Sequence, residues 1–193
     1  MKKIIQICAV LLVMLTMLAC TKDNSPNDEP GIILKVGDAY QGGIIFYILK
    51  VGDAGYDAKV THGLIAATED QDAVYWSLDE NQYKSVSGTL TIIGSGSSNT
   101  DLIIKQNGKG ITYAAGLARL YRGGGYKDWY LPSKDELKEL FKAKDKVGGF
   151  STNAYWYSSE YDATNARGQN FPIGYQGYYF KYYLNRVRAI RSF

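Results

Sequence analysis

Hydrophobic and polar positions along the chain predict strands near both ends of a folded head, with helices between them. Residues 43–49 form an apolar run rich in β-branched residues, and residues 62–67 repeat this pattern, so we expect a core strand at each. Residues 73–76 form a further short apolar segment. Residues 85–98 are rich in Ser, Gly and Thr, which predicts a loop with a short hairpin around 89–93.

Two helices are predicted in the middle of the chain. Asn99 or Thr100 can cap a helix over residues 101–106, and Gly108 then ends it. A second helix fits residues 113–121, where apolar residues recur at helical spacing.

A third helix has the clearest start signal. Ser133 and Glu136 have the spacing of a capping box, in which the serine accepts from a first-turn amide and the glutamate accepts from the serine backbone. From residue 155 onward, aromatic residues interleave with Gly and Asn, and residues 187–191 alternate as one final strand. Strands, then helices, then strands predict an α+β fold with two to three helices and long irregular loops.

Five tyrosines crowd the region before this final strand, at positions 175, 178, 179, 182 and 183. Their spacing would fit one face of a helix, but Gly174 and Gly177 disfavour a helix and tyrosine favours strands. We therefore prefer a loop followed by a strand, which separates a buried set of side chains from an exposed one. One set is Tyr178, Phe180, Tyr182 and Leu184, and the other is Tyr179, Lys181 and Tyr183.

The N-terminal region predicts export. Residues 4–19 are almost unbroken apolar sequence after two lysines, and this run is shorter than the roughly 20 residues that span a bilayer. A small residue followed by Cys20 resembles a bacterial lipoprotein box, which implies cleavage before Cys20 and its acylation. An ordinary secreted protein with an incidental Cys20 is the alternative.

These features predict three parts: a signal peptide over 1–19, acylated Cys20 with a polar tether over 20–35, and a globular head over 36–193. The expected location is the bacterial cell envelope, in the outer membrane and exposed at the surface. The membrane would be contacted through the lipid anchor only.

Charge and cysteine content exclude several classes of function. Without Lys2 and Lys3 the chain has 20 basic and 19 acidic residues, and this net charge of +1 argues against a nucleic-acid partner. The other cysteine, Cys8, lies in the signal peptide, so the head has no thiolate for catalysis or for metal binding.

The remaining candidates for catalysis or metal binding have simpler explanations. His62 is the single histidine and sits in an apolar segment, which favours a structural role. Glu69, Asp70 and Asp72 could hold calcium, but their spacing matches no calcium loop, and a solvated turn explains them better. We therefore expect a protein that is not an enzyme, with no catalytic residue, no metal and no cofactor.

Three blocks of sequence resemble one family. GYKDWYLPS at 125–133, YWYSSEY at 155–161 and RVRAIR at 186–191 are similar to the C-terminal domain family of Legionella collagen-like proteins. VGDAYQGG at 36–43, with HGLIAA at 62–67, resembles an exported, gut-bacterial branch of that family. Tyr157 departs from the serine expected after the tryptophan.

The resemblance implies a C-type-lectin-like α+β fold whose loops bind a ligand. The residues that would build its structural motifs are Trp129, Pro132, Ser133, Glu136, Trp156 and Arg188. The wider fold includes adhesins and the variable proteins of diversity-generating retroelements, so the C-terminal loops could be a diversified surface.

The expected function is that of a cell-surface lipoprotein with a lectin-like, adhesin-type head that binds a glycan or a protein through its C-terminal loops. Tyrosine suits this role because it offers a large amphipathic contact area at low entropic cost. The candidate ligand-binding residues are Tyr157, Asp162, Asn165, Arg167, Gln169, Asn170, Tyr175, Tyr179, Lys181 and Tyr183. The alternative is a structural or assembly lipoprotein of an envelope complex, with a fixed protein–protein interface.

Basic residues near the C-terminus raise a further possibility. Arg186, Arg188 and Arg191, with Arg167 and Lys181 nearby, could bind sulfate groups of a glycosaminoglycan-like polymer. Solvated charges with ordinary ion pairs explain the same residues more simply.

Overall fold

The computed structural model describes residues 33–193, which belong to one unit, Ile33–Phe193. Within these residues the chain forms two β-sheets and four α-helices, so the α+β class predicted from the sequence is confirmed. The predicted signal peptide, Cys20 and most of the predicted tether lie outside the described residues. Among residues 33–193, none of the helices is both long and apolar enough to cross a membrane.

The first sheet is antiparallel and contains the two core strands expected near the start of the head. Its strands are β1 (Ala39–Tyr40), β2 (Gly43–Ile48), β3 (Gly63–Ala66) and β9 (Ile190–Ser192), in the order β1-β2-β3-β9. Ile45 and Ile65 are Cα partners across β2 and β3, and both side chains are fully buried.

The second sheet carries most of the C-terminal half. Its strands are β4 (Gln71–Val74), β8 (Asn185–Val187), β5 (Ala154–Glu160), β6 (Asn165–Asn170) and β7 (Gln176–Phe180), in the order β4-β8-β5-β6-β7. Only β5 and β8 are parallel neighbours in this sheet; its other pairs are antiparallel. Strand β7 therefore lies at an edge of the second sheet.

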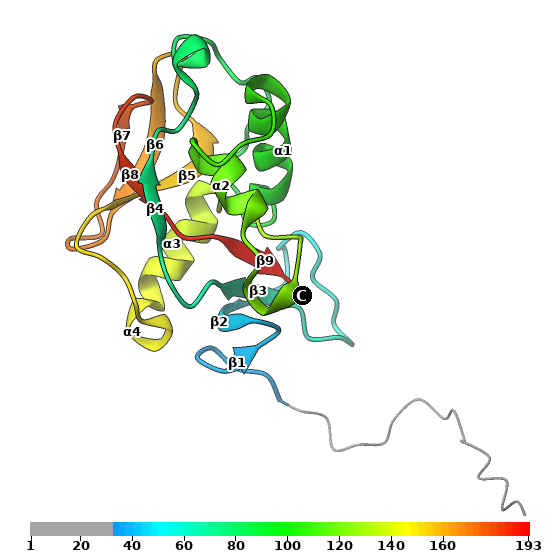
Figure 1. Cartoon of the computed structure of the whole chain (residues 1–193). Coiled ribbons are helices and arrows are strands. Elements are labelled where there is room, and N and C mark those ends of the chain that lie inside the picture. The colour runs from blue at the N-terminus through cyan, green and yellow to red at the C-terminus, as the bar shows by residue number, and fades with distance from the viewer. Residues whose placement is uncertain (1–32) are drawn as a thin grey trace, which may run out of the picture. The chain divides into compact units, whose positions relative to one another are not determined.

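The last residues of the chain do not form one strand, and the prediction for residues 187–191 is wrong. Strand β8 ends in the second sheet and β9 begins in the first, so the red C-terminal segment passes from one sheet to the other (Figure 1). Arg188 lies at this crossing and is fully buried. Its guanidinium donates to the carbonyls of Ala67, Gly148 and Gly149, and these bonds fix the crossing between the two sheets.

The helices lie on both faces of the second sheet: α1 and α2 on one face and α3 on the other. They are α1 (Gly96–Asn107), α2 (Ala114–Leu120), α3 (Lys134–Lys142) and α4 (Lys144–Val147), with 3-10 turns η1 (Asp79–Asn81) and η2 (Gly123–Gly125). Helix α2 matches the prediction for residues 113–121. The short helix α4 has no counterpart among the predicted helices.

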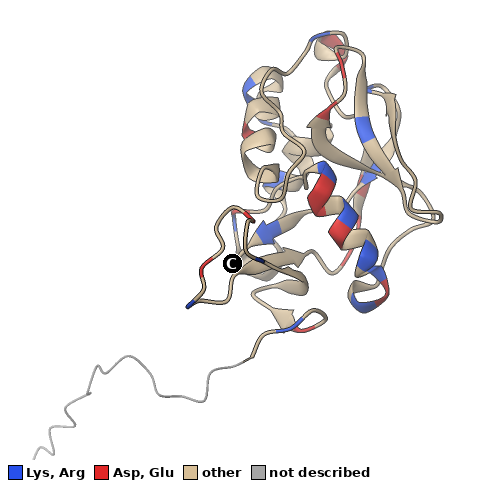
Figure 2. Cartoon of the chain, turned by 180° about the vertical axis from the view of Figure 1, so that it is seen from behind, with Lys and Arg blue, Asp and Glu red and all other residues tan. Residues whose placement is uncertain are grey.

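Helix α3 begins with the capping box predicted from the sequence. Ser133 Oγ accepts from the backbone N–H of Glu136 at 3.3 Å, and Glu136 Oε2 accepts from the backbone N–H of Ser133 at 2.7 Å. Acidic and basic residues follow one another along the ribbon of α3 (Figure 2). Leu137 and Leu140 are fully buried, so the helix turns an apolar side inward.

Helix α1 begins at Gly96, which corrects the predicted caps at Asn99 and Thr100. The side chain of Asn99 is fully buried and bonds the backbone N–H of Leu90 at 2.8 Å and its carbonyl at 2.7 Å. Because Asn99 takes up both backbone groups of Leu90, residues 89–93 form a loop rather than the predicted hairpin.

Two hydrophobic cores lie on opposite faces of the second sheet. Successive side chains of a strand point to opposite faces, and in β5 Trp156 joins one core whereas Tyr155 and Tyr157 join the other. The first core includes Trp76 and Trp129 and side chains of α1 and α2, and the second includes Leu137 and Leu140 of α3. The family-motif residues Trp129 and Trp156 are both fully buried.

Candidate ligand-binding face

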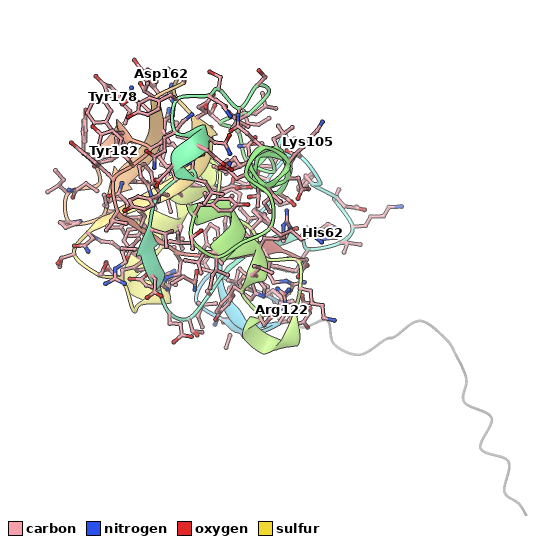
Figure 3. The ribbon with its side chains drawn as sticks, turned by 45° about the horizontal axis from the view of Figure 1, so that its top comes forward. His62, Lys105, Arg122, Asp162, Tyr178 and Tyr182 are labelled. Atoms are coloured by element: carbon pink, nitrogen blue, oxygen red, sulfur yellow. The ribbon has the colours of Figure 1, made fainter. Side chains whose placement is uncertain are left out.

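A group of exposed aromatic rings lies at the outer edge of the second sheet. Tyr178 and Phe180 come from β7, Tyr161 follows β5, and two further tyrosines follow β7. In Figure 3 the labelled Tyr178 and Tyr182 lie on one side of the molecule, close to Asp162. We call this group the aromatic face, and its five members are Tyr161, Tyr178, Phe180, Tyr182 and Tyr183.

The rings of the aromatic face pack against one another in two parallel pairs. The centroids of Tyr161 and Tyr178 are 4.5 Å apart with an interplanar angle of 7°, and those of Phe180 and Tyr182 are 5.0 Å apart at the same angle. Tyr183 meets the second pair edge-on, at 5.6 Å from Phe180 and 5.3 Å from Tyr182. Such packing is worth about 0.5–1.5 kcal/mol per pair beyond area burial, so it restricts the rings although they face solvent.

Successive side chains of strand β7 point to opposite faces of the sheet. Tyr178 is 58% exposed, whereas Tyr179 turns inward and meets Trp156 edge-on, with ring centroids 5.9 Å apart. Room for Tyr179 comes from Gly168 on β6, where a Cβ atom would lie 3.0 Å from the Tyr179 ring. The predicted strand is confirmed over β7, with Tyr178 and Phe180 on the exposed side. Residues 181–184 form a turn instead, in which Tyr182 and Tyr183 are both exposed.

Lys181, at the end of β7, is fully buried rather than available to a ligand, which corrects its predicted role. Its Nζ lies 2.6 Å from Oε1 of Glu160 and donates to the carbonyls of Lys84 and Ala163, each at 2.8 Å. The ammonium also lies 5.0 Å from the centroid of the Trp76 ring. Burial lowers the pKa of Lys181, and the neighbouring Glu160 carboxylate opposes this effect.

The turn between β5 and β6 borders the aromatic face. Asp162 Oδ1 accepts from the backbone N–H groups of Thr164 at 2.8 Å and Asn165 at 2.7 Å, and from the Asn165 side chain at 3.0 Å. Loss of hydration acts to raise the pKa of Asp162, but the bonds from Asn165 and Thr164 outweigh it and lower the pKa. Asp162 and Asn165 thus lie beside the face, where they build the turn.

Arg167 connects the aromatic face to the buried part of the sheet. Its guanidinium carbon lies 4.8 Å from the centroid of the Tyr161 ring, a cation–π contact, and Arg167 is the Cα partner of Tyr178. Among residues 33–193 its Nε has no hydrogen-bond partner although that atom is buried. The guanidinium thus lies beside the aromatic face, and its expected binding role stays a prediction.

Two more residues predicted to contact a ligand, Tyr157 and Gln169, are buried, so these predictions are wrong. Tyr157 is fully buried on β5, and its hydroxyl donates to the carbonyl of Gly177 at 3.4 Å. Burial raises the pKa of Tyr157, against the nearby Arg167 charge. Gln169 is 1% exposed and donates to the carbonyl of Gly174 at 3.1 Å. Both residues lie on inner strands of the sheet.

The remaining predicted contacts divide between the face and its surroundings. Tyr183 belongs to the aromatic face, and Tyr175 is exposed where the chain enters β7. Asn170 bonds within the β6–β7 turn, because its Oδ1 accepts from the backbone N–H of Ile173. Tyr179 is half-buried and packs against Trp156, so only part of its ring is available for the predicted ligand contact. The sequence-based selection missed Tyr161, Tyr178, Phe180 and Tyr182, although strand alternation had grouped three of them.

Arg188 and Arg191 both form ion pairs within the protein, which contradicts their part in the proposed sulfate-binding stripe. Arg188 lies 2.7 Å from Oδ1 of Asp70, and Arg191 lies 2.7 Å from Oδ2 of Asp128. Arg188 has a fully buried side chain, so a polymer could not reach it.

The other candidate chemistry stays separate from this face. His62 Nδ1 lies 3.0 Å from the carbonyl oxygen of Phe193, which ties the chain before β3 to the C-terminus. Asp70, one of the three carboxylates considered for calcium binding, forms an ion pair with Arg188. Within residues 33–193 there is no group of three or more His, Cys, Asp or Glu that could hold a metal ion.

No protein-family model and no curated protein matches the chain. Among solved structures, the fold is similar to that of a fimbrial protein from Bacteroides ovatus, with a TM-score of 0.51 and 14% sequence identity. The similarity covers 81% of this chain and 48% of the fimbrial protein, so this chain spans about half of that protein's length. At this identity the comparison shows a shared α+β fold. The family resemblance and its C-type-lectin-like fold stay predictions.

Proposed function

We propose that the chain is a lipid-anchored binding protein of the bacterial cell envelope, whose head binds a glycan or a protein at the cell surface. The observation that carries this proposal is the aromatic face, in which five exposed rings form two packed groups at the edge of the second sheet. Contiguous exposed apolar patches on soluble proteins commonly mark interaction sites. The fold shared with a fimbrial protein supports a surface-associated role.

The geometry of the face suits binding. Because the rings already pack in two parallel pairs, little side-chain entropy remains to be lost when a ligand orders them. The tyrosine hydroxyls and the Arg167 guanidinium add hydrogen-bond donors at its border. Flat aromatic surfaces with polar borders can pack against the apolar faces of sugars or against protein side chains.

Binding without catalysis is the role that these groups support. Of the charged residues near the face, Lys181, Glu160 and Asp162 are held in buried or turn-building contacts within the described head, and Arg167 stacks on Tyr161. None of them is paired with a nucleophile at the face. We propose neither a nucleic-acid partner nor a cofactor.

A fixed protein–protein interface is the second candidate, and the position of β7 favours it. Strand β7 is an edge strand, and no strand within residues 33–193 pairs with its outer side. Free strand edges are templates for pairing with another chain. The aromatic face would then be a permanent contact in an envelope complex.

One experiment separates these functions. The double variant Tyr178→Ser/Tyr182→Ser should lose binding on a glycan array or in a pull-down from surface extracts, and Tyr56→Ser should retain it. Tyr56 is a suitable control because it is an exposed tyrosine outside the face. Unchanged binding by the double variant would refute the proposal. Loss of one stoichiometric protein partner, with no glycan bound by either protein, would favour the assembly role.

A second experiment tests the location. Protease added to intact cells should digest the head, and Cys20→Ser should release the protein from the membrane fraction. A head that stays protected until the outer membrane is opened contradicts surface display.

A further inference from the structure

A second, basic cavity lies outside the aromatic face. It has a volume of about 330 Å³ and lies between α1, the turn that follows it, α2 and the segment that leads from α2 past η2. Arg122, which lines this cavity, lies in Figure 3 well apart from Tyr178 and Tyr182. The cavity shares no lining residue with the aromatic face and is a separate candidate site.

The lining of this cavity carries a strong positive charge. Four basic side chains line it, Lys109, Arg119, Arg122 and Lys127, and Asp101 is the single acidic one, so its formal charge is 4 − 1 = +3. Asp101 pairs with Arg119 at 2.6 Å. Within residues 33–193, none of the other three basic side chains has a carboxylate within 4.0 Å.

The two arginines are held in place by the protein. Arg119 Nη2 donates to Asp101 and to the carbonyl of Ser97 at 3.2 Å. Arg122 Nη1 donates to the carbonyl of Arg119 at 2.9 Å and to that of Tyr121 at 2.6 Å. Within the described part of the chain, each guanidinium uses one of its three nitrogens in these bonds. Arg122 keeps Nε and Nη2, which together form a fork-shaped donor site that fits an oxyanion, whereas Arg119 keeps single donors on Nε and Nη1.

We propose that this cavity binds a phosphate monoester carried on a small organic body. Three basic groups without a carboxylate partner match a dianion better than a monoanion, and a phosphate monoester carries about −1.5 to −2 charges at pH 7. A carboxylate or a sulfate ester carries one charge. The volume is at the small end of ligand cavities, and Ile104 and Leu120 supply an apolar wall for the organic part.

Calorimetric titration of the full-length chain tests the site, with Cys20→Ser to remove the predicted lipid. Glucose 6-phosphate should bind, and glucose should not. Lys109→Gln/Lys127→Gln should lower the affinity for glucose 6-phosphate by about tenfold or more, because it removes two charge-assisted contacts. Lys105→Gln is the matched control, since it removes a positive charge from α1 at a residue that lines a different cavity. Equal affinities for the two variants, or no binding of the phosphate ester, would overturn the proposal.

Two further arms identify the charge state and the source of the ester. Between about pH 7.5 and pH 5 the phosphate ester loses its second charge, so its affinity should fall, whereas that of glucose 6-sulfate should not. The charged protein groups facing the ligand, Asp101 and the four basic residues, are common to both titrations. The same pH dependence for both esters would contradict the proposal. Flotation with phosphatidylcholine vesicles, with and without phosphatidic acid, tests whether the cavity also binds the phosphate headgroup of a lipid. Binding of glucose 6-phosphate in solution without binding to the phosphatidic acid vesicles assigns the site to a free ester.

Discussion

Lys181 Nζ lies 2.6 Å from Oε1 of Glu160, and the two side chains are only 0% and 9% exposed. This ion pair joins the end of β7 to the end of β5, and the two strands are separated in the sheet by β6. The same ammonium binds the carbonyls of Lys84 and Ala163. The pair therefore holds together the segments that carry the aromatic face.

Removing one partner of this pair should destabilise the head strongly. Lys181→Met leaves the Glu160 carboxylate largely buried without its counter-ion, and such changes cost about 3–5 kcal/mol. The measurement is the free energy of unfolding in urea. Lys181→Met/Glu160→Gln should recover part of the loss because no unpaired charge remains. A single variant within about 1 kcal/mol of the wild type would show that the pair is not buried as described.

Glu136 should make stability depend on pH. Burial raises the pKa of Glu136 from 4.5 to about 7, although backbone bonds from Ser133 and Gly94 oppose the shift. The folded state then holds this proton more tightly than the unfolded chain. The contribution is complete below about pH 4.5 and is lost as the pH rises through about 7, by at most about 3 kcal/mol.

Comparison with Glu136→Gln isolates this effect. The variant keeps an amide oxygen as an acceptor for the capping box but does not titrate. Unfolding free energies measured across this pH range should therefore fall with rising pH more in the wild type than in the variant. Tyr130 also feels the Glu136 charge, but burial raises its pKa well above 10, outside this range. Parallel curves for the two proteins would rule out titration of Glu136 in this range.

Gly96 should resist replacement, because α1 begins against the capping box of α3. A Cβ atom at Gly96 would overlap Oε2 of Glu136 and lie 2.8 Å from the Tyr130 ring and 2.9 Å from the backbone nitrogen of Ser133. Gly96→Ala should therefore cost about 1–3 kcal/mol, despite the better helix propensity of alanine. Thermal unfolding measures the loss, and Lys105→Ala on the exposed side of α1 serves as the control. Equal melting temperatures for the two variants would show that the contact can relax.

The candidate site was only partly predictable from the sequence. Alternation along residues 178–184 predicted a strand with two sets of side chains. That division holds for Tyr178, Tyr179 and Phe180 in β7 but not for Tyr182 and Tyr183, which are both exposed in the turn that follows. Both sets contain tyrosines, so composition could not identify the exposed one. The inward direction of Tyr179 depends on Trp156 and on the space above Gly168, both of which lie on other strands.

The sequence by itself determined the features that depend on neighbouring residues. The capping box at Ser133 acts over three residues, and the strands at 43–48 and 63–66 follow from short apolar runs. Only the tertiary structure decided where the last segment divides and which charges are buried. Arg188 bonds Asp70 across 118 positions of sequence, and this contact lies at the crossing between the two sheets. Local pattern cannot encode such a choice, because its energy comes from partners that only folding brings together.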